Sequence, residues 1–213
     1  MTIFAKFGEI SPALWGILAG LALVGLVLLY VSRSNTQWTV RMLSNAALAV
    51  ALSFVLSCIR LYKMPQGGSI TPASMLPIFL FAYAYGCAPG MLVGMVYGFL
   101  QWMQDGFYMV HPVEAVLDYL LAFAVLGLAG LSRKWPDKWG LPVGCVIGAL
   151  ARAFCAVLSG CIFFGMYAPE GQPVLLYSLS YNALYLLPET AICVVLAAVP
   201  QIRRLAKQIA RNN

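Results

Sequence analysis

The amino-acid sequence predicts an all-α integral membrane protein with seven membrane-spanning helices. Of its 213 residues, 62% are hydrophobic and only 9% are charged, whereas soluble domains carry about 25% charged residues. The hydrophobic residues form runs whose lengths approach the ~20 residues that cross a bilayer as a helix. Most Lys and Arg residues lie in the short connections between these runs. A single water-soluble domain is therefore excluded.

The seven predicted spans follow one another with short connections. They cover residues 12–32, 38–60, 71–86, 88–104, 113–132, 141–165 and 173–199. The third and fourth are short, and a tight turn around residues 87–90 joins them. We expect the first span to be retained, because it is long enough to cross the membrane and no A-x-A cleavage site follows it.

The cations predict how the chain is oriented in the plasma membrane. Nine of them fall on one side of the predicted topology, and this side is expected to be cytoplasmic. They are Arg33, Arg41, Arg133, Lys134, Lys138, Arg203, Arg204, Lys207 and Arg211. The amino terminus is then outside and the carboxyl terminus inside. Because the net charge of +6 is accounted for by these connections, it does not indicate a nucleic-acid partner.

Small residues recur at the spacing of helix-packing faces. One series has a glycine at every fourth position from 86 to 98, and a second runs from 140 to 148. Glycine stripes let helix backbones approach closely in a membrane. No strand or Walker pattern accompanies them, so we interpret them as packing faces and not as phosphate-binding loops.

The six cysteines do not predict a metal or redox site. They lie in or beside hydrophobic segments and form no C-x-x-C pair, so we interpret them as small buried hydrophobic residues. No metal and no cofactor is expected.

Two charged residues are predicted to pair within the membrane. Arg152 and Glu189 reach a similar depth in their spans, since a helix rises 1.5 Å per residue. A charge inside the bilayer is costly and needs a partner or a function. We therefore predict a structural ion pair between Arg152 and Glu189.

Two carboxylates at the start of the fifth span predict a different kind of site. In HPVEAVLDYL (111–120), Glu114 and Asp118 are one helical turn apart, so they share a helix face. No cation is predicted at their depth, and two such carboxylates attract a cationic ligand. Glu114 alone has another interpretation, since acidic residues favour the first turn of a helix. Asp118 is therefore the stronger candidate.

Aromatic residues and one amide are predicted at the same outer level. Asn182 lies one turn beyond Tyr177, and its amide requires either a neighbouring helix or a ligand as a partner. Aromatic rings are common at membrane interfaces, but beside an unpaired acid they also suit a flat cation. The aromatic residues are Trp102, Phe107, Tyr108, Tyr119, Phe163, Phe164, Tyr167, Tyr177 and Tyr181.

Four segments in order carry a resemblance to a known family. They are GGSITPASMLPIFLFAYAYG (67–86), VYGFLQWM (96–103), HPVEAVLDYLLAFAVLGLAGL (111–131) and SGCIFFGMYAPEGQPVLLYSLSYNALYLLPE (159–189). Over about residues 40–205, the chain resembles the thiamine-specific substrate-binding subunit, or S component, of energy-coupling factor (ECF) transporters. The resemblance implies six helices with a vitamin site near the outer face. It also implies an ECF module of one membrane T component and two ATPase subunits, on which the S component topples to release the vitamin inside.

The resemblance implies roles for individual residues. Asp118 and Tyr119 match an acid–tyrosine pair, and Tyr177 and Asn182 match a Y-S-x-x-x-N stretch. The implied lid over the site is RLYKMPQGGS (60–69), and Ala47 and Ala51 match an A-x-x-x-A contact with the T component. The full predicted substrate-binding set is Asp118, Tyr119, Glu114, Tyr177, Asn182, Gly160, Phe164 and Trp102.

The chain departs from the family pattern at three places. Ala156 stands where the family has a histidine for the pyrimidine ring, and Asp118 replaces the more frequent Glu. The candidate substrates are therefore thiamine, a close analogue, or its pyrimidine or thiazole fragment. The third departure is the leading helix, which divides the chain into an extra N-terminal helix (1–36), a six-helix substrate-binding domain (37–205) and a cytoplasmic tail (206–213).

Two alternatives belong to other classes of protein. A stand-alone secondary carrier would use Asp118, Glu189 and Arg152 as an ion relay, but the repeated halves typical of such carriers are not evident. An intramembrane enzyme lacks a nucleophile–base pair, since His111 is expected at an exposed loop edge. The chain also has no nucleotide-hydrolysis motif, so a transport subunit energised by a partner is the preferred interpretation.

Overall fold

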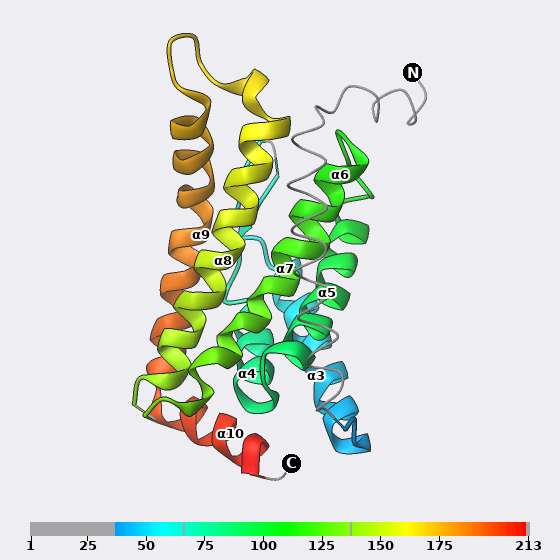
Figure 1. Ribbon diagram of the computed structural model, residues 1–213, viewed down its shortest axis with the longest axis vertical. Coiled ribbons are helices and arrows are strands. Elements are labelled where there is room, and N and C mark those ends of the chain that lie inside the picture. Colours follow the sequence, from blue (N-terminus) through cyan, green and yellow to red (C-terminus); the bar gives the residue numbers. More distant parts are fainter. Residues whose placement is uncertain (1–36, 66, 137, 212–213) are drawn as a thin grey trace.

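The structure is a computed structural model that describes residues 37–65, 67–136 and 138–211 (Figure 1). The predicted first span (12–32) and the leading segment 1–36 lie outside the described residues.

The described chain is predominantly helical, as predicted. Residues 112–134 form one continuous helical segment, which passes from α-helix to π-helix, back to α-helix and then to 3-10 helix. The helices are α3 (Val40–Cys58), α4 (Leu76–Tyr85), α5 (Cys87–Gln104), α6 (Pro112–Ala115), η1 (Val116–Leu121), α7 (Ala122–Ala124), η2 (Val125–Lys134), α8 (Gly140–Phe163), η3 (Gly165–Tyr167), α9 (Val174–Ala198) and α10 (Pro200–Arg211).

Four of the described helical segments are long and apolar enough to cross a membrane. They are Val40–Cys58, Pro112–Lys134, Gly140–Phe163 and Val174–Ala198. α4 is apolar but has only 10 residues, fewer than the ~20 of a full span. The structure therefore supports an all-α membrane protein, in which α4 is shorter than its predicted span.

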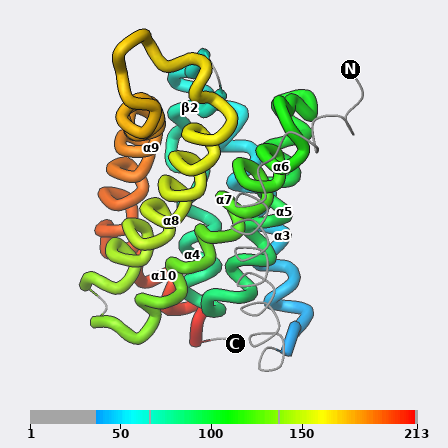
Figure 2. The backbone as a smooth tube through the Cα atoms, turned by 45° about the horizontal axis from the view of Figure 1, so that its top comes forward, coloured from blue at the N-terminus to red at the C-terminus, as the bar shows by residue number. Residues whose placement is uncertain are grey.

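The long helices form an elongated bundle with two distinct ends (Figures 1 and 2). The connection between η2 and α8 lies at the same end as α10, which crosses beneath the bundle, whereas the connection between α8 and α9 lies at the opposite end. Arg133, Lys134, Lys138 and the four cations of α10 thus gather at one end, as the charge pattern predicts.

Close glycine contacts hold the α6–η2 segment against α5. A Cβ added at Gly94 would lie 2.2 Å from the Phe123 carbonyl oxygen, and one at Gly98 would lie 2.1 Å from that of Tyr119. No other residue type permits this backbone approach. The interpretation of this glycine series as a packing face is confirmed for Gly90, Gly94 and Gly98, whereas Gly86 has φ = 101° and no atom within 4 Å of an added Cβ. The packing at Gly98 fixes the position of η1.

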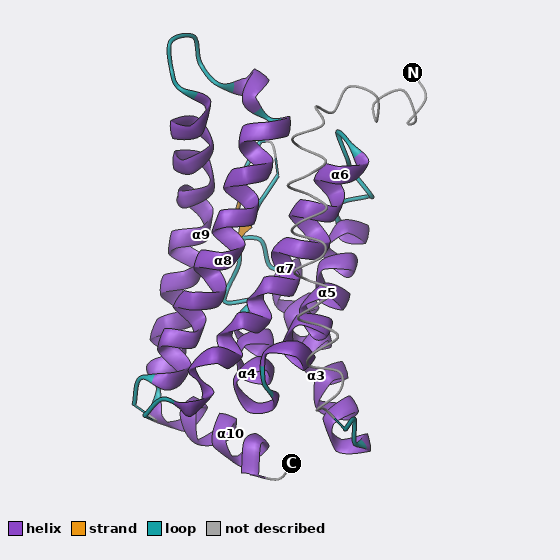
Figure 3. Ribbon diagram, in the orientation of Figure 1, coloured by secondary structure: helices purple, strands orange, loops and turns teal. Residues whose placement is uncertain are grey.

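Two features of the chain differ from the predicted arrangement. A short antiparallel hairpin of β1 (Tyr62–Lys63) and β2 (Ser69–Ile70) follows α3 (Figure 3). In addition, residues 206–211 do not form a separate tail, because α10 continues through them and packs against α4. Ala206 is fully buried, since the apolar residues of α10 recur on one helix face.

Candidate functional site

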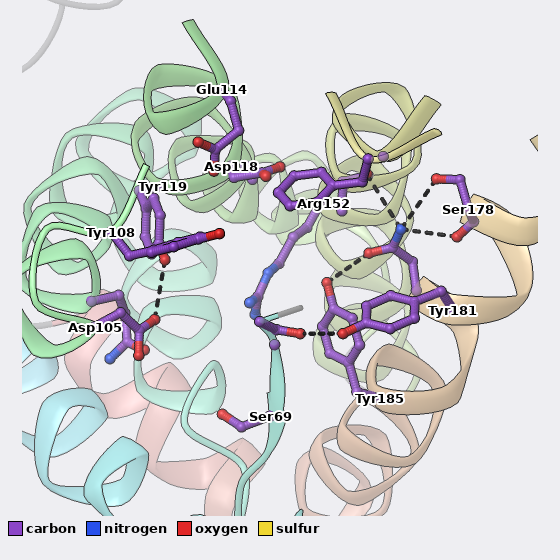
Figure 4. A pocket seen from close by; sticks show the side chains of 18 of the residues that line it. Ser69, Asp105, Tyr108, Glu114, Asp118, Tyr119, Arg152, Ser178, Tyr181 and Tyr185 are labelled. Carbon is purple, nitrogen blue, oxygen red and sulfur yellow. Dashed lines mark hydrogen bonds between the residues drawn. The ribbon is translucent and has the colours of Figure 1, made fainter. Parts of the chain in front are cut away.

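A cavity of about 340 Å³ lies between the hairpin, the end of α5, η1, α8 and α9. Seven of the eight residues of the predicted substrate-binding set line it, and Trp102 does not. The seven are Glu114, Asp118, Tyr119, Gly160, Phe164, Tyr177 and Asn182. Figure 4 shows how the side chains of several of them converge.

Asp118 is presented to the cavity by a π-helical turn. η1 covers Val116–Leu121 and is wound as a π-helix, a local widening that occurs often at functional sites. The half-buried Asp118 carboxylate accepts a hydrogen bond of 2.8 Å from the Ser159 hydroxyl of α8. The sequence predicted regular helix here, because a π-helical turn has no simple residue signature.

Glu114 has a structural contact in addition to its place in the cavity. The buried carboxylate accepts a 2.9 Å hydrogen bond from the Val110 backbone N–H, just before α6. The helix-start interpretation of Glu114 is therefore supported. His111 is buried and not at an exposed edge as expected: its Nδ1 accepts a hydrogen bond from the Val113 N–H, and its ring stacks on Phe163.

The predicted ion pair between Arg152 and Glu189 is not formed. One Glu189 oxygen, Oε1, accepts hydrogen bonds from the hydroxyls of Thr71 (2.5 Å) and Ser74 (2.7 Å). Arg152 instead places its guanidinium 4.1 Å from the centroid of the Phe123 ring, a cation–π contact. No Arg152 nitrogen lies within 4.0 Å of a Glu189 carboxylate oxygen.

Arg152 also corrects the expectation that no cation shares the depth of the two carboxylates. Its side chain lines the same cavity and extends into it below Asp118 (Figure 4). Among the described residues, however, no Lys or Arg nitrogen lies within 4.0 Å of Glu114 or Asp118; the ion pair at this distance is Arg60–Asp105, at 2.8 Å. The carboxylates thus remain available to a ligand.

Trp102 lies behind Tyr119 and outside the cavity lining. Their rings stack with centroids 6.3 Å apart, and the indole N–H donates to the Tyr108 carbonyl. The Tyr119 hydroxyl in turn donates to Asp105. Trp102 therefore orients a lining residue and does not itself face the cavity.

The amide of Asn182 is fully satisfied by its own helix and by α8. Its nitrogen donates to the carbonyls of Ser178 (2.9 Å) and Ala156 (3.3 Å), and its oxygen accepts from the Tyr185 hydroxyl (2.7 Å). Of the two partners considered for this amide, the structure supplies the neighbouring helix.

The hairpin after α3 covers the cavity at the place predicted for a lid. Lys63, Pro65 and the stretch Gly67–Ser69 contribute to the cavity lining. The Tyr181 hydroxyl of α9 donates to the Gly67 carbonyl at 2.9 Å. Tyr185, Gln101 and Ser159 also surround the site, but nothing in their sequence context set them apart from ordinary membrane residues.

Ala47 and Ala51 lie away from the cavity. Both are exposed on α3 and line an apolar groove of about 650 Å³ between α3 and α5. Their role in docking a partner stays a prediction.

The fold and the site define a class: a helical membrane protein that encloses a small polar and aromatic cavity near one end of its bundle. The pattern of the thiamine transporter protein family (Thia_YuaJ) matches residues 43–209. The chain belongs to this family, and the resemblance stated from the sequence is confirmed.

Individual relatives agree with this assignment. The chain is 39% identical to the thiamine transporter ThiT of Bacillus subtilis over 144 residues, covering 62% of this chain and 74% of the relative. It is 30% identical to ThiT of Lacticaseibacillus paracasei over 139 residues, covering 59% and 69%. A solved structure of ThiT from Listeria monocytogenes shares the fold, with a TM-score of 0.69 and 23% identity over 79% of this chain and 96% of that one.

Proposed function

We propose that the protein is the high-affinity thiamine-binding S component of an ECF-type transporter. It binds the vitamin in the cavity beneath the hairpin and delivers it inward with a membrane T component and two ATPase subunits. Family membership and two relatives named as thiamine transporters support this proposal. The chain itself carries out no catalysis in this scheme.

The observation that carries the proposal is the environment of Asp118. Its side chain lines the cavity, its carboxylate accepts one hydrogen bond from Ser159, and no Lys or Arg nitrogen of the described chain lies within 4.0 Å of it. A thiazolium cation could place its positive charge directly against this carboxylate, which Arg152 does not contact, and in a partly dry site this attraction is stronger than in water. Tyr119 and Tyr177 line the cavity, and aromatic rings can stack on flat heterocycles.

The proposed membrane arrangement has seven spans, six in the S-component core and one in the leading segment. The cation-rich end with α10 faces the cytoplasm, and the cavity end faces outward. The amino terminus is then outside. The groove at Ala47 and Ala51 would receive the T component.

Titration calorimetry tests the proposal. The purified protein is titrated with thiamine and, in parallel, with its hydroxymethylpyrimidine precursor. Tight thiamine binding supports the proposal and shows that the site accepts the vitamin with Ala156 in place of the family histidine. Heat only from the precursor identifies the pyrimidine fragment as the substrate in place of thiamine. Thiamine uptake into liposomes by the protein alone, without an ATPase, would instead establish a stand-alone carrier.

A further inference from the structure

We propose that Glu189 is a positioning residue that holds the hairpin over the cavity through the turn 71–75. The proposal deepens the proposed function. Its prediction for the dissociation of thiamine rests on that function, whereas its prediction for the hairpin of the ligand-free protein does not. Glu189 is fully buried and does not line the cavity. Any effect that it has on a bound ligand must therefore pass through another part of the chain.

The turn 71–75 is the segment that Glu189 contacts. It connects β2 of the hairpin to α4, and its Thr71 and Ser74 hydroxyls both donate to Glu189 Oε1. The Ser74 backbone N–H also donates to the Thr71 hydroxyl, at 3.3 Å. One carboxylate oxygen of α9 thus fixes both ends of the turn, and hydrogen bonds to a charged acceptor are stronger than neutral ones.

The backbone of this turn adopts a conformation that needs such support. Ala73 has φ = 67° and is buried, a left-handed conformation that a residue with a Cβ rarely adopts. Residues of this kind persist only where their surroundings over-determine them. Here the Ala73 N–H donates to the Thr71 carbonyl at 2.8 Å, and the Glu189 contacts enclose it on both sides.

Glu189 continues a row of α9 residues that contact the hairpin. Tyr181, Tyr185 and Glu189 are spaced by four residues and so share one face of the helix. Tyr181 donates to the Gly67 carbonyl, and the Tyr185 ring packs so closely on Gly68 that a Cβ there would lie 2.8 Å away. Figure 4 shows both tyrosines beside the cavity. Glu189 holds the turn 71–75, through which the hairpin connects to α4.

Hydrogen exchange, followed by mass spectrometry on the ligand-free protein, directly tests the clamp, that is, the contact of Glu189 with Thr71 and Ser74. Thr71→Val and Glu189→Met each remove one side of the contact, whereas Glu189→Gln keeps an acceptor oxygen. Ser132→Ala is the control, because it deletes another buried hydroxyl that bonds to Ala129 on η2. We expect faster exchange confined to residues 61–75 in Thr71→Val and Glu189→Met, partial recovery in Glu189→Gln, and no local change in Ser132→Ala.

The rate of thiamine dissociation, measured by stopped-flow fluorescence, supplies the second readout. Loosening the clamp should raise it by about tenfold in Thr71→Val, the equivalent of one lost hydrogen bond to a charged group. Unchanged exchange at 61–75, or an increase spread evenly over all helices, overturns the proposal. If the wild type does not bind thiamine, the proposed function fails. Hydrogen exchange on the ligand-free protein still shows whether Glu189 holds the turn 71–75 and the hairpin. Should Glu189→Met not fold, Thr71→Val and Glu189→Gln carry the test.

Discussion

The Asp118 carboxylate and the Ser159 hydroxyl are joined by a hydrogen bond of 2.8 Å between η1 and α8. This contact uses Oδ2 of Asp118, and no second hydrogen bond to that carboxylate occurs within the described residues. The bond therefore orients the carboxylate and leaves Oδ1 for a ligand. It also ties the π-helical turn to the helix that carries Ala156 and Gly160, two other residues of the cavity lining.

Replacing Asp118 by Asn should weaken thiamine binding strongly with little effect on folding. Asn keeps the size of the side chain and an acceptor for Ser159, but it removes the charge opposite the thiazolium. The loss should amount to about 1.5–3 kcal/mol, or roughly ten- to a hundredfold in Kd by calorimetry. Glu170→Gln is the matched control, since Glu170 is exposed in the connection between α8 and α9. Equal losses in the two variants would refute the cation site.

Exchanging the charges of Arg152 and Glu189 should not restore folding. The double variant Arg152→Glu with Glu189→Arg would rescue the single changes if the two residues formed a direct pair. In the structure, an arginine at 189 would instead meet the hydroxyls of Thr71 and Ser74 without an acceptor for them. Melting temperature and the monodisperse fraction in detergent measure the outcome. Clear recovery in the double variant would reinstate the ion pair.

The sequence predicted which residues gather at the site better than it predicted their partners. The four-residue spacing placed Glu114 and Asp118 on one face, and both reach the cavity. Depth along a span, however, does not determine the rotation of a helix about its axis. Arg152 and Glu189, which were predicted at a similar depth, contact Phe123 and the turn 71–75 and not each other. The glycine series was predictable where close packing requires that residue, as at Gly94 and Gly98, but not at Gly86, which serves a turn.

The hairpin and the π-helical turn show why the remainder was not predictable. The strands have two residues each, too few for an alternating pattern. η1 is held by backbone contacts at Gly98 and by Ser159, which lies 41 residues from Asp118 in the sequence. Such features depend on tertiary contacts, and local residue preferences do not encode them.

Replacing Gly94 by Ala should destabilise the bundle and lower the affinity of the site. The new methyl group would lie 2.2 Å from the Phe123 carbonyl oxygen, which belongs to rigid backbone. Forcing α5 away from α7 should cost about 1–3 kcal/mol. Gly165→Ala is the control, because its methyl group would approach only the Val174 side chain, at 3.1 Å. Thermal melting in detergent compares the two variants, and equal melting temperatures would contradict the packing argument.

Replacing Ala51 by Trp should separate ligand binding from transport. Ala51 is exposed in the apolar groove of α3 and α5 and makes no contribution to the cavity, so calorimetry should give an unchanged thiamine affinity. The bulky ring would fill the groove that the proposed T component occupies, and uptake in cells that carry the ECF module should be abolished. Leu187→Trp, at an exposed position of α9, is the control and should retain uptake. If Ala51→Trp lost thiamine binding while it still co-purified with the module, the groove would not be the docking surface. Retained uptake with full thiamine binding would lead to the same conclusion, because a docking face cannot accept an indole ring without loss of complementarity.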